Sequence, residues 1–328
     1  MLNVSNFILI TGGAGYIGSH TTHFLVREGV DPKRIVIIDN LVYGHKEHLP
    51  SGVIFIEGDL CNKSELESVF LQYKIEVVIH FAAYAYVGES MSDPSKYFTN
   101  NITGGLNLLE TMRQFKCNKI VFSSSCATYG HCGHNEIITE EHEQNPINPY
   151  GETKLIFEKF LFWYCSSYDI QSVSLRYFNA AGADFGIGEN HNPETHIIPL
   201  TINAALPKGN ALKVFGNNYS TIDGTCVRDF IHVTDLARAH FLSVNYLKDN
   251  NSSTSVNLGT GTGNSVLEII YLIEEISNQK VNYTFEEKRK GDADFLVASN
   301  SKAFEILNWK PEKTIENIIE SAWSWHTS

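Results

Sequence analysis

Short apolar runs alternate with amphipathic stretches along the first half of the chain. The runs are rich in Val and Ile and are apolar nearly throughout, as is typical of parallel strands buried on both faces. We expect strands at residues 7–11, 35–39, 53–57, 77–81, 119–123 and 172–177. The stretches between them predict helices at residues 16–28, 64–73, 99–115 and 150–164. This alternation predicts an α/β fold with a doubly wound parallel sheet.

Local signals mark the ends of several of these helices. Gly29 follows the first helix and is a natural helix stop. The Ser64-x-x-Glu67 spacing predicts a capping box at the start of the second helix. Asn148 suits the N-cap of the helix at residues 150–164, and Pro149 suits its first helical position.

The alternation loosens after about Ala180. Residues 184–194 are rich in Gly, Asn and Asp and predict a loop. Beyond it we expect a smaller α+β lobe, with helices near residues 265–276 and 314–323. We therefore expect one domain over residues 1–180 and a second over residues 181–328. The boundary is soft, because later strands can return to the first sheet.

Composition narrows the functional classes. Hydrophobic residues make up 43% of the chain, enough for a full core. No apolar run reaches the roughly 18 residues of a membrane helix, and the first residues lack a signal-peptide pattern. The six cysteines are scattered without a Cys-x-x-Cys pair, as in reduced cytoplasmic proteins, and we expect no metal site. The net charge of −12 argues against nucleic-acid binding.

A glycine-rich segment lies between the first expected strand and helix. It can be read as Gly12-x-x-Gly15-x-x-Gly18 or with Gly13 as its first glycine. Glycines here allow a tight turn and let backbone N–H groups approach a pyrophosphate. Glycine patterns also occur in ordinary turns, but Asp39 ends the second strand about 20 residues later, where a carboxylate can hold ribose hydroxyls. Together they predict dinucleotide binding, and the anion favours NAD over NADP.

Tyr150 and Lys154 form a candidate acid–base pair. They are spaced i and i+4 on one helical face, and an ammonium favours the phenolate form of a nearby tyrosine. A surface tyrosine beside a solvated lysine gives the same spacing, but the dinucleotide segment upstream makes the pair more specific. The strand before it ends in three serines at residues 123–125, any of which can bind the same substrate oxygen.

These residues together resemble the extended short-chain dehydrogenase/reductase family and, within it, the UDP-glucose 4-epimerases, also called UDP-galactose 4-epimerases. The resemblance runs nearly end to end. Its most specific stretches are residues 11–20, 78–83, 87–90, 149–151, 175–179, 223–233 and 257–259. It implies an isomerase that reversibly inverts C4 of a UDP-hexose, UDP-glucose or UDP-galactose, through a 4-keto intermediate. It also implies tightly held NAD, a homodimer, a Rossmann domain for NAD and a second domain for the UDP-sugar.

The resemblance implies a role for each matching position. The implied catalytic residues are Ser125, Tyr150 and Lys154. The implied cofactor contacts are Gly12, Gly15, Tyr16, Ile17, Gly18, Asp39, Asn40, Asp59, Leu60, Phe81, Ala82, Asn100, Tyr150, Lys154 and Tyr177. The implied UDP-sugar contacts are Ser125, Tyr150, Asn179, His196, Ile197, Phe215, Arg228, Arg289, Asp292 and Leu296, with the two arginines on the diphosphate.

Some positions depart from the family pattern. Ala85 replaces a frequent lysine that contacts the cofactor, and His196 replaces a usual asparagine. Leu296 stands at a size gate that is a tyrosine in members restricted to glucose and galactose, which leaves N-acetylated UDP-sugars open as substrates. Two alternatives are a nucleotide-sugar 4,6-dehydratase and a non-catalytic NAD-binding protein. The first needs an acidic pair where Cys126 and Ala127 stand, and the second typically lacks the tyrosine or lysine.

Overall fold

The computed structural model describes residues 6–131, 136–250, 252–289 and 293–328. Its centre is a seven-stranded parallel sheet in the order β11-β7-β5-β4-β1-β2-β3. The strands are β1 (Phe7–Thr11), β2 (Ile35–Asp39), β3 (Ile54–Glu57), β4 (Ile75–His80), β5 (Lys119–Ser125), β7 (Gln171–Tyr177) and β11 (Thr254–Leu258). All six strands expected from the sequence are present, and the doubly wound fold is confirmed. β11 adds a late edge strand, so the chain enters this sheet again after residue 181.

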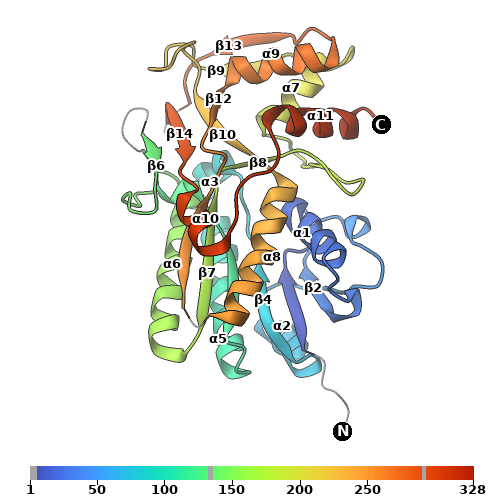
Figure 1. The fold of residues 1–328 in the computed structure, drawn as a ribbon, viewed down its shortest axis with the longest axis vertical. Coiled ribbons are helices and arrows are strands. Elements are labelled where there is room, and N and C mark those ends of the chain that lie inside the picture. The colour runs from blue at the N-terminus through green and yellow to red at the C-terminus, as the bar shows by residue number, and fades with distance from the viewer. Residues whose placement is uncertain (1–5, 132–135, 251, 290–292) are drawn as a thin grey trace.

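Helices cover both faces of the sheet (Figure 1). One face packs against α2 (Lys63–Gln72), α5 (Gly104–Gln114) and α6 (Pro149–Tyr168). The other packs against α1 (Tyr16–Arg27), α8 (Val233–Asp249) and α10 (Ser301–Leu307). Both faces of the sheet are therefore buried, which explains why its strands are apolar nearly throughout.

The first residue of a helix in the structure is set more by its N-cap residue than by where its apolar pattern begins. α6 begins as expected, because the Asn148 side chain accepts a hydrogen bond from the backbone N–H of Gly151. The capping box predicted at Ser64 is wrong. Asn62 is the N-cap of α2, and the Ser64 hydroxyl donates to its side-chain oxygen, so Ser64 lies inside the helix. Capping boxes occur instead at Ser265 and Thr314.

Connecting elements complete the first lobe and bring the chain back over the sheet edge. They are the helical turns η1 (Pro32–Arg34), η2 (Lys46–His48) and η4 (Cys126–Thr128), and the short helices α3 (Val87–Ser92) and α4 (Pro94–Tyr97). The expected helix at residues 99–115 starts as a π-helical stretch, η3 (Phe98–Thr103), before α5. Because β4 and β5 are parallel neighbours, their carboxyl ends lie side by side, where the cleft described below opens.

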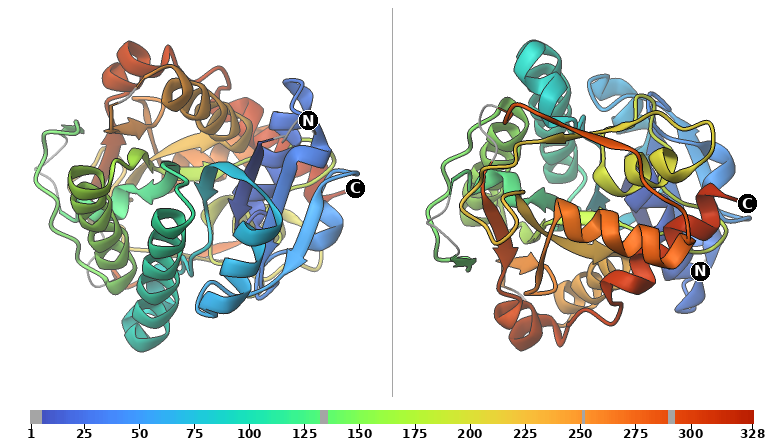
Figure 2. Two further views of the ribbon diagram at one scale, coloured as in Figure 1. Left: turned by 90° about the horizontal axis from the view of Figure 1, so that it is seen from below. Right: turned by 90° about the horizontal axis from the view of Figure 1, so that it is seen from above.

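The second lobe lies at one end of the first (Figure 1). Its strands are β6 (Ile137–Ile138), β8 (Asn179–Ala181), β9 (Leu212–Phe215), β10 (Val227–His232), β12 (Gly263–Ser265), β13 (Tyr283–Glu286) and β14 (Phe295–Ala298). β10 is central and pairs with β8, β12 and β14. The helices α7 (Ile197–Ala205), α9 (Val266–Ser277) and α11 (Ile315–His326) pack against this lobe around their own apolar core (Figure 2).

The strand order reverses between β1 and β4, which are neighbours in the sheet. The loops at the carboxyl ends of these two strands diverge, and in doubly wound sheets ligands bind in the crevice that results. Within the described parts of the chain, no helix has both the length and the apolar character needed to cross a membrane.

Candidate active site between the two lobes

A cavity of about 1090 Å³ lies at the carboxyl ends of the large sheet and extends to the second lobe. It gathers most of the residues that the sequence singled out. From the first lobe these are Gly12, Gly15, Tyr16, Ile17, Gly18, Asp39, Asn40, Asp59, Leu60, Phe81, Ala82, Asn100, Ser125, Tyr150, Lys154 and Tyr177. From the second lobe they are Asn179, His196, Ile197, Arg228, Arg289 and Leu296. Phe215 is not among its lining residues, and Asp292 lies outside the described residues.

The turn between β1 and α1 has room only for glycine at its closest approaches. Gly12 has φ +70°, and a Cβ there would lie 2.5 Å from the backbone nitrogen of Ala82. A Cβ on Gly18 would lie 2.4 Å from the carbonyl oxygen of Gly12. The missing side chains leave a backbone-lined hollow at the N-terminus of α1, which has the partial positive charge that suits a phosphate.

Asp39 is fixed at the carboxyl end of β2. Its two carboxylate oxygens accept the backbone N–H groups of Ala14, at 3.0 Å, and Leu41, at 2.9 Å. Burial raises the pKa of Asp39, and these two hydrogen bonds lower it. The carboxylate therefore lies beside the glycine turn and lines the same cavity.

The three serines at the end of β5 have different partners. The Ser123 hydroxyl lies 3.1 Å from His240 Nε2 and accepts a hydrogen bond from Tyr177. The Ser124 hydroxyl donates to the Glu158 carboxylate. Ser125 is the one that lines the cavity, and its hydroxyl oxygen caps η4 by accepting the N–H of Ala127.

Tyr150 and Lys154 come from the first turns of α6 and are buried at the cavity wall. The Lys154 ammonium lies 5.8 Å from the centre of the Tyr150 ring and donates to the carbonyl of Ser123 at 2.7 Å. Burial raises the pKa of Tyr150 above its ordinary value, and Tyr177 adds to this, whereas a hydrogen bond with Ser125 lowers it. Burial lowers the pKa of Lys154 to about 7. A phenol, a hydroxyl and an amine thus meet in one apolar corner.

Glu158 holds this corner in place one turn further along α6. Its carboxylate is paired with the Arg176 guanidinium of β7 at 2.6 Å, and both side chains are 8% exposed. It also accepts the Ser124 hydroxyl of β5. Tyr150, Lys154 and Glu158 are spaced i, i+4 and i+8, so one face of α6 bears the reactive groups and the anchor.

The opposite wall of the cavity carries two arginines from the second lobe. Arg228 lies on β10, next to Leu296 of β14 in the strand register. The Arg289 guanidinium stacks on the Phe215 ring, with 4.0 Å between its carbon and the ring centre. Phe215 therefore supports a cavity residue. A pair of guanidinium groups in one cleft suits a diphosphate.

Comparison with known proteins identifies the family of this fold and site. A family model described as the NAD dependent epimerase/dehydratase family matches residues 8–259. The chain belongs to this family. It is 48% identical over 325 residues to a UDP-glucose 4-epimerase of Rhizobium meliloti, covering 98% of each chain.

Solved structures of the epimerase/dehydratase family superpose along the whole chain. UDP-glucose 4-epimerase from Brucella ovis in complex with NAD has a TM-score of 0.92 at 44% identity, with 98% of each chain covered. UDP-glucose 4-epimerase from Bifidobacterium longum, in complex with NAD+ and UDP, has a TM-score of 0.92 at 35% identity and the same coverage.

Sequence reasoning missed several cavity residues of this family member. Tyr84 and Tyr86 follow β4 and line the cavity with Tyr43, which follows β2. Their position just past strands that end at the cleft is a signal that could have found them. Glu189 and His191 also line the cavity, although they lie in the loop expected at residues 184–194. Only their charge and spacing distinguish them from ordinary loop residues.

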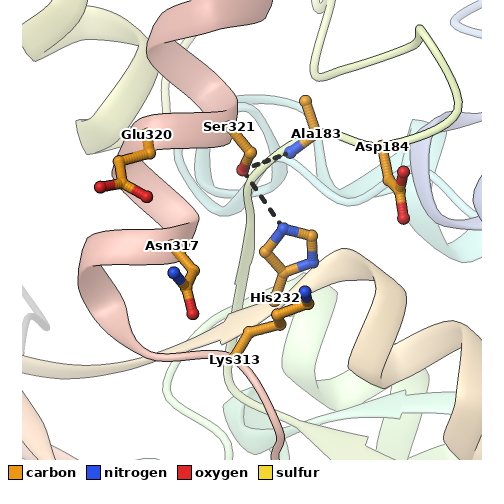
Figure 3. A pocket seen from close by; sticks show the side chains of 7 residues that line it. All are labelled: Ala183, Asp184, His232, Lys313, Asn317, Glu320 and Ser321. Atoms are coloured by element: carbon orange, nitrogen blue, oxygen red, sulfur yellow. Dashed lines mark hydrogen bonds between the residues drawn. The ribbon is translucent and has the colours of Figure 1, made fainter.

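A second, smaller pocket lies where α11 meets β8 and β10, and in it Ser321 bonds to two other lining residues (Figure 3). Ser321 Oγ accepts the backbone N–H of Ala183 at 3.1 Å and lies 3.2 Å from His232 Nε2. Asp184, which also lines the pocket, accepts the hydroxyl of Thr234. The two bonds of Ser321 fasten the C-terminal helix to the second lobe.

Proposed function

We propose that this chain is an NAD-dependent UDP-glucose 4-epimerase, an isomerase that reversibly inverts C4 of a UDP-hexose. One observation carries the proposal: Ser125, Tyr150 and Lys154 line the same cavity as the glycine turn and the two arginines. A cofactor, a sugar and a diphosphate therefore each have a matching surface in one cleft. Its relatives are named for this activity.

The N-terminal part of the cleft fits NAD. Gly12 and Gly18 leave the hollow that a pyrophosphate needs, and Asp39 supplies an anion at the end of β2. A carboxylate at this place accepts ribose hydroxyls and repels a 2′-phosphate, which favours NAD over NADP. When bound, NAD supplies the hydride acceptor and donor that no side chain offers. The further cofactor contacts proposed are Tyr16, Ile17, Asn40, Asp59, Leu60, Phe81, Ala82, Asn100 and Tyr177.

Three side chains handle the proton of the sugar 4-hydroxyl. Tyr150 takes the proton when C4 is oxidised and returns it when the 4-keto group is reduced. Ser125 binds the same oxygen and orients it. In its protonated form, Lys154 stabilises the phenolate form of Tyr150 by its positive charge. All three side chains are less than a tenth exposed, so the proton is handled away from bulk water.

We assign the two lobes to the two ligands. Residues 1–180 form the NAD-binding domain, and residues 181–328 supply the UDP-sugar contacts while adding β11, α8 and α10 to the first lobe. Arg228 and Arg289 bind the diphosphate. Asn179, His196, Ile197, Phe215, Asp292 and Leu296 complete the UDP-sugar site. A diphosphate held at one end allows the keto sugar to turn over and present its other face.

Leu296 favours a wider substrate range. It lines the cavity from β14, where a leucine takes less space than a tyrosine. We therefore propose that UDP-N-acetylglucosamine and UDP-N-acetylgalactosamine are interconverted as well. The dehydratase alternative is not favoured, because Cys126 and Ala127 follow Ser125 and neither supplies a carboxyl group.

We further propose that the protein is a cytoplasmic homodimer. α5 and α6 run side by side on the outside of the large sheet (Figure 2). Their exposed large side chains include Leu106 at 38%, Phe162 at 64% and Trp163 at 65%. Exposed apolar side chains on neighbouring helices are typical of a protein interface. A second copy of the chain can cover them symmetrically.

The direct test is to incubate the purified protein with UDP-galactose, and separately with UDP-N-acetylgalactosamine, and to resolve the products by chromatography. The proposal expects UDP-glucose in the first case and UDP-N-acetylglucosamine in the second. Cofactor released on denaturation should be NAD. Unchanged UDP-galactose, or release of mostly NADP, would refute the corresponding part of the proposal.

A further inference from the structure

Four side chains of one loop converge beside the candidate active site. They are Glu189, His191, Glu194 and His196, from the segment that connects β8 to α7. One possible ligand atom from each lies within 4.8 Å of the other three. Two imidazole nitrogens and two carboxylate oxygens are ligands that Zn²⁺ accepts in proteins.

The separations match a small coordination site. His196 Nδ1 lies 2.8 Å from Glu189 Oε1 and 2.9 Å from Glu194 Oε1. His191 Nδ1 lies 3.2 Å from Glu189 Oε1 and 3.9 Å from Glu194 Oε2. Ligands of a tetrahedral Zn²⁺ are about 3.4 Å apart, given metal–ligand bonds of about 2.1 Å. The observed values lie on both sides of this distance.

Hydrogen bonds alone leave the cluster incompletely satisfied. His196 Nδ1 can carry one proton, which cannot align with two carboxylates at once. Glu194 Oε1 already accepts the backbone N–H groups of Thr195 and His196. His191 Nδ1 is buried and lacks an aligned hydrogen-bond partner among the described residues. A single cation would use both Nδ1 lone pairs and one oxygen from each carboxylate.

Charge supports the same conclusion. The Glu189 side chain is 5% exposed and is paired with the His196 imidazole, but one protonated imidazole compensates only one of the two carboxylates that it faces. Tyr16 and Tyr86 place their rings 6.1 Å and 5.8 Å from the His191 ring, so part of the surroundings is aromatic. A divalent cation would neutralise both carboxylates and fix the loop that forms this wall of the cleft.

We propose that Glu189, His191, Glu194 and His196 form a Zn²⁺ site. Four protein ligands leave no open position, so the ion is structural and holds residues 189–196 against the cavity. The ion binds through residues of the chain alone, so its test needs neither NAD nor a UDP-sugar, but its ligand His196 is also one of the proposed UDP-sugar contacts.

The test is a competition titration of the full chain, prepared without a polyhistidine tag, with Zn²⁺ and a chromophoric chelator. We expect one tight site per chain. His191→Ala and the isosteric Glu194→Gln should each weaken it at least about a hundredfold, because either removes a ligand. His142→Ala is the matched control, since His142 also lies near a carboxylate, Glu136, at 3.5 Å. It should bind as the wild type does.

Co²⁺ gives a second readout that separates this site from the cysteines. Four nitrogen and oxygen ligands give visible ligand-field bands without thiolate charge-transfer absorption in the near ultraviolet. These bands should be lost in Glu194→Gln, whose folding is checked by circular dichroism. The absence of stoichiometric binding, equal binding in the variants and the wild type, or a thiolate band would each overturn the proposal.

Discussion

Ser125, Tyr150 and Lys154 show how burial sets the chemistry of single residues. Burial alone would keep the phenol protonated and the amine neutral, because each charged form loses its water. The hydrogen bond of Ser125 acts in the other direction on Tyr150. Opposing effects of burial and hydrogen bonding therefore set the pKa of Tyr150, and neither effect can be read from the sequence.

Tyr150→Phe removes the hydroxyl and leaves the ring. The variant should fold and bind NAD, but its turnover of UDP-galactose should fall by about 10²–10⁴-fold, the range of general acid–base catalysis. The measurement is kcat together with bound NAD per chain. Tyr168→Phe, on the exposed end of the same helix, is the control. Turnover within a few-fold of wild type would remove Tyr150 from the mechanism.

Lys154 should make the stability of the cofactor-free chain depend on pH. Its pKa is about 7 in the folded state, below the ordinary 10.5, so between these values the unfolded chain binds a proton that the folded chain has released. The free energy of unfolding therefore rises with pH in this window, by at most about 1.4 kcal/mol per pH unit. Below pH 7 the cost of burying the amine is fully present.

Lys154→Met removes the titrating amine. The free energy of unfolding, measured with denaturant at pH 7 and pH 9, should therefore rise less with pH than it does in the wild type. Lys159→Met changes an exposed lysine of the same helix and should keep the wild-type rise. The same pH dependence in Lys154→Met and the wild type would mean that Lys154 is not buried as a neutral amine.

Leu296 is the residue on which substrate breadth depends. Leu296→Tyr should lower kcat/KM for UDP-N-acetylgalactosamine much more than for UDP-galactose, because a filled pocket excludes the larger 2-substituent by clash. Leu296→Val keeps the space open and should retain both activities. An equal loss on both sugars would indicate damage to the fold, and a wild type inactive on N-acetylated sugars would rule out the open gate.

At the scale of elements, α6 is the part of the fold on which the site depends. Its buried Glu158–Arg176 pair ties it to β7 and, through Ser124, to β5. Arg176→Met leaves the carboxylate without its cation and should lower the free energy of unfolding by about 3–5 kcal/mol.

The matched control breaks an exposed pair. Arg113→Met removes the partner of Glu110 in a pair whose side chains are 45% and 31% exposed. This change should lower the free energy of unfolding by at most about 1 kcal/mol. Urea denaturation of Arg176→Met and Arg113→Met measures the loss of unfolding free energy in each variant. Similar losses would show that burial of the first pair adds nothing to its importance.

Sequence patterns predicted the elements of the first lobe well and those of the second lobe less well. Strands such as β1 and β2 are apolar except for their last residue because helices cover both their faces, and this leaves a clear pattern. β8 and β12 have three residues each, too few to form a pattern. The Ser64 capping box failed because Asn62, two residues earlier, competes for the same helix start.

Among the site residues, too, some stand in a sequence pattern that predicts them and others do not. Gly12, Asp39 and Tyr150 stand in motifs whose chemistry depends on local spacing, so the sequence could indicate them. Ser125 could not be chosen over Ser123 and Ser124, since the choice depends on partners more than thirty residues away, such as Glu158 and His240. The resemblance, not the residue pattern, indicated the second-lobe contacts such as Arg228.

At the scale of the whole molecule, no single point in the sequence separates the two lobes, because the chain passes between them more than once. β11 is a strand of the large sheet and α8 packs on that sheet, although both follow β10 of the second lobe in sequence. The walls of the cleft are therefore joined by several crossings of the chain. Such a connection suits an enzyme that must retain a keto intermediate while the sugar turns over.

The central claim is that hydride leaves C4 of the sugar and returns to C4 of the same molecule. The most direct measurement uses UDP-galactose deuterated at C4, converted in ordinary water and analysed by mass spectrometry and NMR. The account predicts UDP-glucose that keeps its deuterium at C4. Product that has lost deuterium to solvent, or no UDP-glucose at all, would contradict it.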